Sequence, residues 1–291
     1  MQKKTYAGQP VVTLNNGVDI PALGFGVWQM ENLDECEKAV VKAIHTGYRM
    51  IDTAAIYQNE TAVGQAVKDS GVNRDELFIT SKVWVQDHGY EKAKKAFQRT
   101  LDRLQMDYLD MYLIHWPYGD FLGTWKALEE LYAEGKIKAI GVCNFTVEKL
   151  EELKANSKVH PVINQIELHP VFQQKELQVY DRENNIVTQP WSPLGNGNAD
   201  LLNNSQLKAV AEKYNKTVAQ VILRWHLQEG FVVIPKSVTP SRIEENFNVF
   251  DFELTEEEMN IVRSLDTGKR LFFDPKDPEW EEKMLKSVAD I

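Results

Sequence analysis

The sequence predicts an α/β fold in which eight parallel strands, each followed by a helix, form a (β/α)8 barrel. Short runs of β-branched and aromatic residues alternate with longer helical patterns from about residue 23 to the end. The length of 291 residues suits such a barrel. The competing doubly wound sheet needs a third glycine after Gly24 and Gly26, and Gln29 stands in its place.

A β-hairpin is predicted ahead of the barrel. The apolar runs 11–14 and 18–21 flank Asn15, Asn16 and Gly17. Asn-Gly favours a tight two-residue turn, because both residues tolerate positive φ. The eight predicted barrel strands then cover 23–26, 48–52, 77–82, 108–115, 137–142, 162–167, 186–191 and 231–235.

Apolar residues at one-face spacing predict the helices between these strands. The first helix follows a cap at Asn32 or Asp34. The apolar faces are Cys36, Val40, Ala43 and Ile44; Ala93, Ala96, Phe97, Thr100, Leu101 and Leu104; Trp125, Leu128, Leu131 and Tyr132; and Val218, Val221, Ile222 and Trp225. Glycines predicted in the left-handed region just past helix ends are Gly47, Gly71, Gly135 and Gly230.

The chain shows no linker or repeat, so we expect one domain over residues 1–291. The tail 271–291 lies beyond the eighth unit and carries Phe272, Phe273 and Trp280. Such a tail can cover the mouth of a barrel or pack on its outer helices, and the sequence does not decide between the two.

The composition excludes several classes of function. With 33 Lys+Arg against 43 Asp+Glu the formal net charge is −10, which disfavours binding to nucleic acid or to an anionic membrane. The two cysteines, Cys36 and Cys143, suit a reducing compartment. Since neither a secretory signal nor a membrane-spanning stretch is evident, we expect a cytoplasmic protein.

Four titratable side chains fall at the ends of three consecutive predicted strands. Asp52 and Tyr57 follow the second strand, Lys82 ends the third, and His115 ends the fourth. Active sites of these barrels lie at that rim. Similar places after later strands are held by Asn144, Gln165, Trp191 and Lys236.

These residue types suit the reduction of a carbonyl group by hydride from a cofactor. The charge of Lys82, held by Asp52, should lower the pKa of Tyr57, which could then protonate an oxygen that gains negative charge. His115 could donate a hydrogen bond to the same oxygen. The alternative is a structural Asp52–Lys82 ion pair with Tyr57 on a surface loop.

A phosphate site is predicted in the segment 234–246. Lys236, Ser237 and Arg242 lie around a Pro-Ser helix start, and a helix N-terminus with two cations binds phosphate. An ordinary capped surface helix is the alternative.

No metal site is predicted, because the six histidines do not show the spacing of metal ligands. Glu167 and His169 suggest a hydrogen-bonded pair. No Gly-x-Ser-x-Gly nucleophile motif occurs.

Several of these segments, in order, resemble signatures of the aldo-keto reductase family. They are Gly47-Tyr48-Arg49-Met50-Ile51-Asp52-Thr53-Ala54 with Tyr57, Glu60 and Gly64; the run 107–117; the segment 234–246; Asn164-Gln165-Ile166-Glu167-Leu168-His169-Pro170; and Trp191-Ser192-Pro193-Leu194-Gly195. The similarity runs from about residue 11 to 275. Met50 stands where members often have a smaller residue or histidine, and Cys143 where many have serine.

The resemblance implies NADPH bound outside any Rossmann fold, with Asp52, Tyr57, Lys82 and His115 as a catalytic tetrad in which Tyr57 is the general acid. It implies nicotinamide contacts for Asn144, Gln165 and Trp191, with Ser192 and Leu194 nearby. It also implies 2′-phosphate contacts for Lys236, Ser237, Val238 and Arg242, and adenine contacts for Glu245 and Asn246. The paired cations favour NADPH over NADH.

The substrate pocket is predicted to have an aromatic wall of Trp28, Trp84 and Trp116, with His115 at its base. The segment 117–123 is short, as in bacterial members that reduce diketogluconate or methylglyoxal. We therefore expect small dicarbonyls, aldehydes or keto-sugars as substrates, and a monomer. Two rival functions remain: a lyase that uses Lys82 as a Schiff-base nucleophile, and a non-catalytic NADPH-binding or scaffold protein on the same fold.

Overall fold

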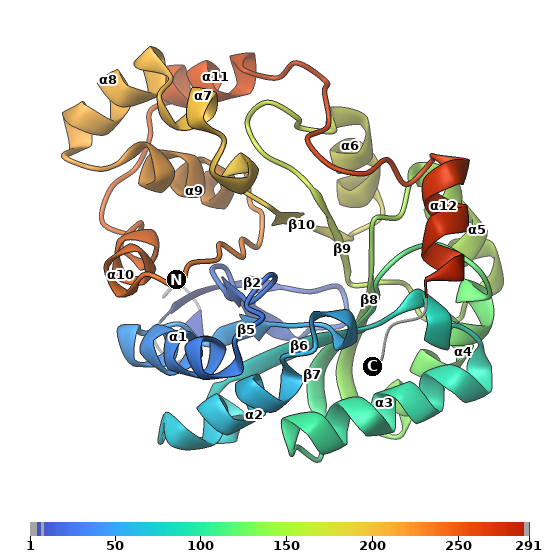
Figure 1. Ribbon diagram of the computed structural model, residues 1–291. Helices are drawn as coiled ribbons and strands as arrows, with labels where there is room; N and C mark the ends of the chain where they lie inside the picture. Colours follow the sequence, from blue (N-terminus) through green and yellow to red (C-terminus); the bar gives the residue numbers. More distant parts are fainter. Residues whose placement is uncertain (1–4, 7–8, 288–290) are drawn as a thin grey trace.

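A parallel sheet curls through the centre of the molecule, with helices packed outside it (Figure 1). This is a computed structural model, and it describes residues 5–6, 9–287 and 291. The sheet has seven strands in chain order, each parallel to its neighbours. They are β4 (Phe25–Gly26), β5 (Met50–Asp52), β6 (Phe78–Val83), β7 (Leu109–Ile114), β8 (Ile137–Cys143), β9 (Ile163–Glu167) and β10 (Val187–Trp191).

The helices lie between and after these strands. Those between strands are α1 (Leu33–Thr46), α2 (Glu60–Asp69), α3 (Tyr90–Leu104), α4 (Phe121–Ala133), α5 (Val147–Asn156) and α6 (Lys175–Glu183). After β10 come α7 (Ala199–Leu202), α8 (Ser205–Tyr214), α9 (Val218–Gln228), α10 (Pro240–Phe247), α11 (Glu256–Ser264) and α12 (Pro278–Lys286). Short 3-10 turns are η1 (Ala55–Tyr57), η2 (Arg74–Glu76), η3 (Val85–Asp87) and η4 (Gly195–Gly197).

Helix ends follow the predicted signals. Asn32, not Asp34, caps α1, since its side chain accepts a hydrogen bond from the Glu35 amide (3.0 Å). The buried face of α3 consists of the six predicted residues. Gly47, Gly71, Gly135 and Gly230 all have positive φ, as expected past helix ends.

The eighth predicted strand, 231–235, is reduced to one bridge between Val233 and Leu23. Backbone hydrogen bonds still connect this segment to both edges of the sheet: Gly24 donates to Val233 (2.7 Å), and Val232 donates to Thr188 (3.4 Å). A longer ladder does not form, because β4 has two residues and Pro235 has no N–H to donate.

The predicted N-terminal hairpin is present, with a different turn. β2 (Gln9–Thr13) pairs antiparallel with β3 (Asp19–Pro21), and β1 (Thr5–Tyr6) adds a third strand. Leu14 and Val18 close a three-residue loop in which Gly17 has φ 84°. The predicted two-residue turn is therefore wrong: the sequence fits a type I turn ending in a left-handed glycine, which needs positive φ at one residue only.

Strand alternation decides which side chains face the inside of the curled sheet. Met50 and Phe78 pack inside it with Leu14 and Ile20 of the hairpin. Two residues further along their strands, on the same face, come Asp52 and then, after Thr80, Lys82. The interior thus changes from apolar at the hairpin end to charged at the carboxyl ends of the strands.

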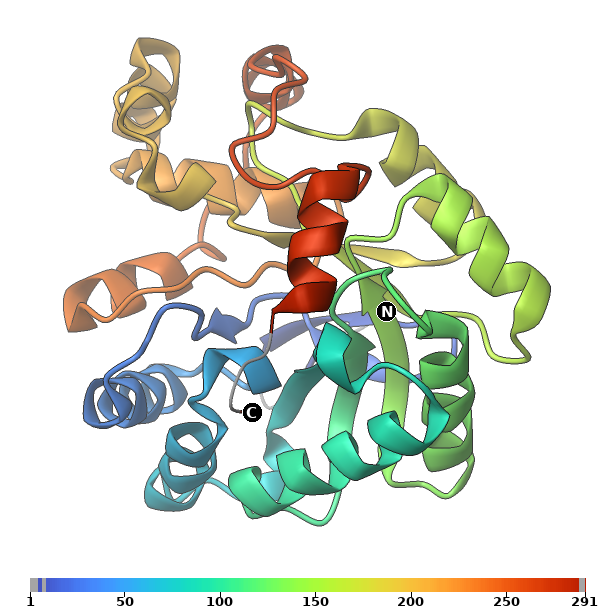
Figure 2. The same cartoon turned by 45° about the vertical axis from the view of Figure 1, so that its right-hand side comes forward.

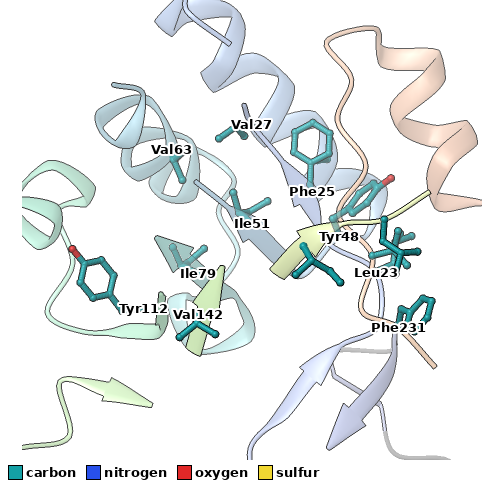
Figure 3. Close-up of a cluster of buried hydrophobic side chains, with 14 of the residues drawn as sticks. Leu23, Phe25, Val27, Tyr48, Ile51, Val63, Ile79, Tyr112, Val142 and Phe231 are labelled. Carbon is teal, nitrogen blue, oxygen red and sulfur yellow. The ribbon is translucent and has the colours of Figure 1, made fainter. Parts of the chain in front are cut away.

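The opposite strand faces pack against the helices. Figure 3 shows this cluster of buried side chains, in which Ile51, Ile79 and Val142 from three strands of the sheet lie with Val63 from α2. This packing fixes the strands, and hence the polar residues at their ends. In Figure 2 the C-terminal helix α12 stands in front of the sheet. Among the described residues no helix is long and apolar enough to cross a membrane.

Candidate active site

One large cavity, of about 1230 Å³, opens at the carboxyl ends of the strands. Predicted site residues from both ends of the chain line it together. They are Trp28, Asp52, Tyr57, Trp84, His115, Trp116, Asn144, Gln165, Trp191, Ser192, Leu194, Lys236, Ser237, Arg242, Glu245 and Asn246. Of the predicted site residues, Lys82 and Val238 are not part of its wall.

Asp52, Lys82 and Tyr57 form a buried group at the floor of the cavity. Lys82 Nζ donates to Asp52 Oδ1 at 2.5 Å and to the carbonyl of Thr53 at 2.8 Å. The same Nζ lies 3.5 Å from Tyr57 Oη. Lys82 is 0% exposed and does not touch the cavity itself. Its charge acts on Tyr57 and Asp52, which do line the cavity.

His115 completes the group from the end of β7. Its ring lies edge-on to Tyr57, with centroids 5.7 Å apart, and edge-on to Trp84 at 5.1 Å. The backbone amide of His115 donates to Val83, which ties the ends of β6 and β7 together (3.2 Å). Acid, amine, phenol and imidazole therefore converge at one place.

Burial controls the ionisation of this group. Burial raises the pKa of Tyr57 to about 12, although the Lys82 cation acts in the opposite direction. Lys82 lowers the pKa of Tyr57 as expected, but desolvation, which the sequence analysis did not weigh, has the larger effect. Burial alone would lower the pKa of Lys82, but Asp52 and the other facing groups together raise it. Burial, with the nearby Lys82 charge, holds the pKa of His115 well below its usual value, so the ring is neutral at pH 7.

Three more predicted residues, Asn144, Gln165 and Trp191, make hydrogen bonds beside this group. Gln165 Nε2 donates to Asp52 Oδ2 and to Gln189 Oε1, both at 2.8 Å. Asn144 Nδ2 donates to the carbonyl of His115 (3.0 Å), and Trp191 Nε1 donates to Asn144 Oδ1 (2.9 Å). Asn144 has φ 61°. The two amides are thus held in place by the protein and line the cavity, Asn144 from just after β8 and Gln165 from within β9.

The predicted phosphate site lies at the start of α10, at the end of the cavity called the phosphate end below. Lys236 and Arg242 are exposed, and neither has an ion-pair partner among the residues described here. The side chain of Thr239, at the N-cap of α10, accepts no hydrogen bond from the first turn, and Pro240 follows it. Free amides at a helix start with two cations can hold a phosphate group.

Val238 departs from the predicted set. Its side chain packs against the hydrophobic core and borders a smaller hollow with Asn32 and Pro240 instead of the large cavity. Cys143 is fully buried in the interior of the sheet, and burial raises the pKa of its thiol. Its side chain is thus part of the packing beneath Asn144.

The end of the cavity that holds the predicted tetrad, called the catalytic end below, has aromatic walls, and the C-terminal tail supplies part of them. Phe272 lies edge-on to Trp191 (5.0 Å) and to Trp28 (6.0 Å). Trp280 lies edge-on to Trp116 (6.0 Å) and stacks on Phe273 (3.6 Å). Phe272, Phe273 and Trp280 of the tail thus line the cavity.

Other lining residues have no signal that the sequence analysis could use. They include Ile56, Asn196, Gly197, Leu202, Thr217, Val218, Ala219 and Met284. Thr217 fits a helix-capping pattern, and its hydroxyl also donates to Glu245 Oε1 (2.8 Å). Its place in the wall depends on how α9 packs beside α10.

No group of three or more His, Cys, Asp or Glu side chains suited to a metal occurs in the described part of the chain. His169 Nε2 lies 3.1 Å from Glu167 Oε1, as the predicted hydrogen-bonded pair.

Comparison with known proteins gives consistent matches over most of the chain. The profile of the Aldo/keto reductase family matches residues 22–267. Glyoxal reductase of Bacillus subtilis is 54% identical over 261 residues, 89% of this chain and 94% of that protein. Methylglyoxal reductase DkgA of Escherichia coli is 48% identical over 272 residues, 92% and 98% of the two chains. A crystal structure of a Gox0644 mutant in complex with NADPH superposes with a TM-score of 0.88 at 42% identity, covering 92% of this chain and 98% of that one.

Proposed function

The chain belongs to the aldo/keto reductase family and is a nicotinamide-dependent oxidoreductase, and on that basis we propose that it reduces small neutral aldehydes and α-dicarbonyls to alcohols with NADPH. One observation carries the proposal: a single cavity joins the Asp52–Lys82–Tyr57–His115 group to the cations around α10. A reducing cofactor can thus lie with its phosphate at one end and its reactive ring at the other.

NADPH supplies a hydride to the substrate carbonyl, and the chain's own residues supply the proton. Tyr57 holds its proton at neutral pH, because burial raises its pKa to about 12. Lys82 Nζ, 3.5 Å from Tyr57 Oη, stabilises the phenolate left after proton transfer. Asp52 keeps Lys82 charged and oriented. Neutral His115 donates a hydrogen bond that fixes the angle of the carbonyl.

The residues fit NADPH along the length of the cavity. Lys236, Ser237 and Arg242 would hold the 2′-phosphate, and Glu245 and Asn246 would contact the adenine. Asn144 and Gln165 would hold the carboxamide, and Trp191 would stack on the nicotinamide, with Ser192 and Leu194 beside it. Val238 would contribute through its backbone, since its side chain packs in the core. The cations favour NADPH over NADH.

The charges in the wall favour neutral substrates over sugar acids. The charged residues that line the cavity are Glu31, Asp52, Lys236, Arg242 and Glu245. Both cations lie at the phosphate end, so the carboxylate of a diketogluconate would enter an aromatic pocket without a cation to pair with. Burying an unpaired charge is costly. Glyoxal and methylglyoxal, named for two relatives, carry no charge.

The rival functions fit the geometry less well. A Schiff-base lysine must be deprotonated and reach the substrate, whereas Lys82 is fully buried, paired with Asp52 and absent from the cavity wall. A non-catalytic scaffold protein would have no use for a charged pair buried beneath an open cavity.

We further propose that residues 1–291 form one domain, that the segment 231–235 closes the barrel, and that the chain works as a monomer. Gel filtration tests the last point.

The test is NADPH oxidation, followed by absorbance, with methylglyoxal, an aromatic aldehyde and 2,5-diketogluconate in parallel, repeated with NADH. We expect turnover with NADPH, higher kcat/KM for the two neutral substrates, and a much higher KM for NADH. Faster turnover of the diketogluconate would refute the neutral preference, and no turnover on any carbonyl would refute the reductase.

A further inference from the structure

The proposed mechanism makes no use of Glu167, a fully buried carboxylate at the end of β9. Glu167 Oε1 accepts a hydrogen bond from the Leu271 amide at 2.7 Å. The same oxygen lies 3.1 Å from His169 Nε2, and Oε2 lies 3.5 Å from Arg270 Nη1. A buried acid thus holds two consecutive residues at the base of the C-terminal tail.

Arg270 closes a ring of contacts around this acid. Its Nη2 donates to Gln174 Oε1 (3.2 Å), and Gln174 Nε2 donates to the backbone carbonyl of Glu167 (2.6 Å). The guanidinium also lies over the ring of Phe172, 4.6 Å from its centroid. Charged groups taken out of water need such complete pairing, and their pairing then fixes the geometry of what they hold.

Leu271 and Phe272, which follow Arg270, connect this anchor to the wall of the cavity. Leu271 packs over the start of η4, since a Cβ placed on Gly195 would lie 3.3 Å from Leu271 Cδ1. Phe272 lies between Trp191 and Trp28. The chain from 265 to 277 forms neither helix nor strand, so the position of Phe272 depends on single contacts of this segment, such as this anchor and the hydrogen bond from the Thr267 amide to the Val171 carbonyl (2.9 Å).

We propose that Glu167 and Arg270 are positioning residues, which fix Phe272 between Trp28 and Trp191 and thereby set the affinity for carbonyl substrates with an aromatic substituent. This inference rests on the proposed function, because it assigns the aromatic wall to the substrate. A two-carbon dicarbonyl at Tyr57 and His115 needs no such wall. An aromatic aldehyde fills it.

The decisive variant is Arg270→Gln, which removes the charge and keeps much of the length of the side chain. We expect the KM for an aromatic aldehyde to rise about tenfold, the scale of one lost charged hydrogen bond. The kcat and the KM for glyoxal should stay near their wild-type values. Arg270→Lys keeps the charge and should recover part of the loss.

Arg74→Gln is the matched control. Arg74 pairs with the buried Asp110 at the hairpin end of the sheet, and the two arginine side chains are equally exposed, at 22% for Arg74 and 21% for Arg270. The control should lower the melting temperature and leave the KM for both aldehydes unchanged. An equal rise in KM in both variants would overturn the proposal and assign Arg270 a general role in stability.

A double variant tests whether the anchor acts through Phe272. Phe272→Leu should raise the KM for the aromatic aldehyde, and Arg270→Gln added to it should raise that KM no further. Additive effects would overturn the proposal that Arg270 acts through Phe272.

Near-UV circular dichroism tests the anchor independently of the proposed function. Arg270→Gln should change the aromatic signal even in a protein without turnover, and Arg74→Gln should not. An unchanged signal in Arg270→Gln would refute the anchor.

Discussion

The two ends of the cavity use charge in opposite ways. At the catalytic end the charges of Lys82 and Asp52 are buried and paired with each other, and aromatic rings form the surrounding wall. At the phosphate end Lys236 and Arg242 are exposed around a helix start. A buried pair keeps its geometry and tunes a neighbouring proton, whereas exposed cations are available to an anion from solution. Chemistry and cofactor choice should therefore be separable by mutation.

Lys82→Met should have the largest effect of these changes, and it acts at the catalytic end. Loss of the cation beside Tyr57 should lower kcat about 10²- to 10³-fold, the scale of one lost electrostatic contact in a transition state. It also leaves Asp52 buried without its cation, which should cost about 3–5 kcal/mol of unfolding free energy. Stopped-flow turnover and urea unfolding measure the two effects. Lys138→Met, which removes one of the two cations paired with buried Asp110 at the hairpin end, should reduce stability only. Equal turnover in both variants would contradict a catalytic role for Lys82.

Arg242→Leu tests the phosphate end. The KM for NADPH should rise about 10- to 100-fold, because one charged hydrogen bond to the phosphate is lost. The kcat, the KM for NADH and the melting temperature should hardly change. Steady-state kinetics with both cofactors measures these constants. An equal rise in the KM for NADH would show that Arg242 does not bind the 2′-phosphate.

The pH dependence should also differ between the two ends. The pKa of His115 lies well below its usual value, so the ring stays neutral until the pH falls far below 6.5. Tyr57, with its pKa near 12, loses its proton only as the pH rises toward that value. The kcat for reduction should therefore be flat from about pH 6 to 9. The KM for NADPH should rise as the pH falls through about 6, where a phosphate monoester gains a proton. A step in kcat near 6.5 would contradict a neutral His115.

Salt should give the smallest effect. Raising the ionic strength from about 0.05 to 0.5 M screens exposed charges, so the KM for NADPH should rise a few-fold. The kcat depends on a buried pair and should not change. Equal salt effects on both constants would remove the contrast between the two ends.

The meeting of Asp52, Lys82 and Tyr57 at one place could be predicted from sequence, because the strands that carry them enforce it. Alternation puts Asp52 and Lys82 on the inner face of neighbouring strands, so strand ends marked by β-branched runs also mark the site. The ionisation of Tyr57 could not be predicted, because the sequence does not say how completely the ring is desolvated. The eighth strand illustrates the same limit, since its pairing depends on the short partner β4.

The tail lay beyond what sequence patterns can place. Phe272 and Trp280 reach the cavity through single contacts between distant segments, such as the Leu271 amide on Glu167. Such contacts follow no periodicity. The motif around Glu167 marked a pair with His169 but gave no sign of its third partner, Arg270.

The central claim, that Tyr57 delivers the proton in an NADPH-dependent reduction, is tested most directly by Tyr57→Phe. Turnover of methylglyoxal and the Kd for NADPH would be measured on the same samples. The structure predicts a loss of turnover of about 10²-fold or more, the usual contribution of a general acid, with an unchanged Kd for NADPH. Wild-type turnover in Tyr57→Phe would contradict it.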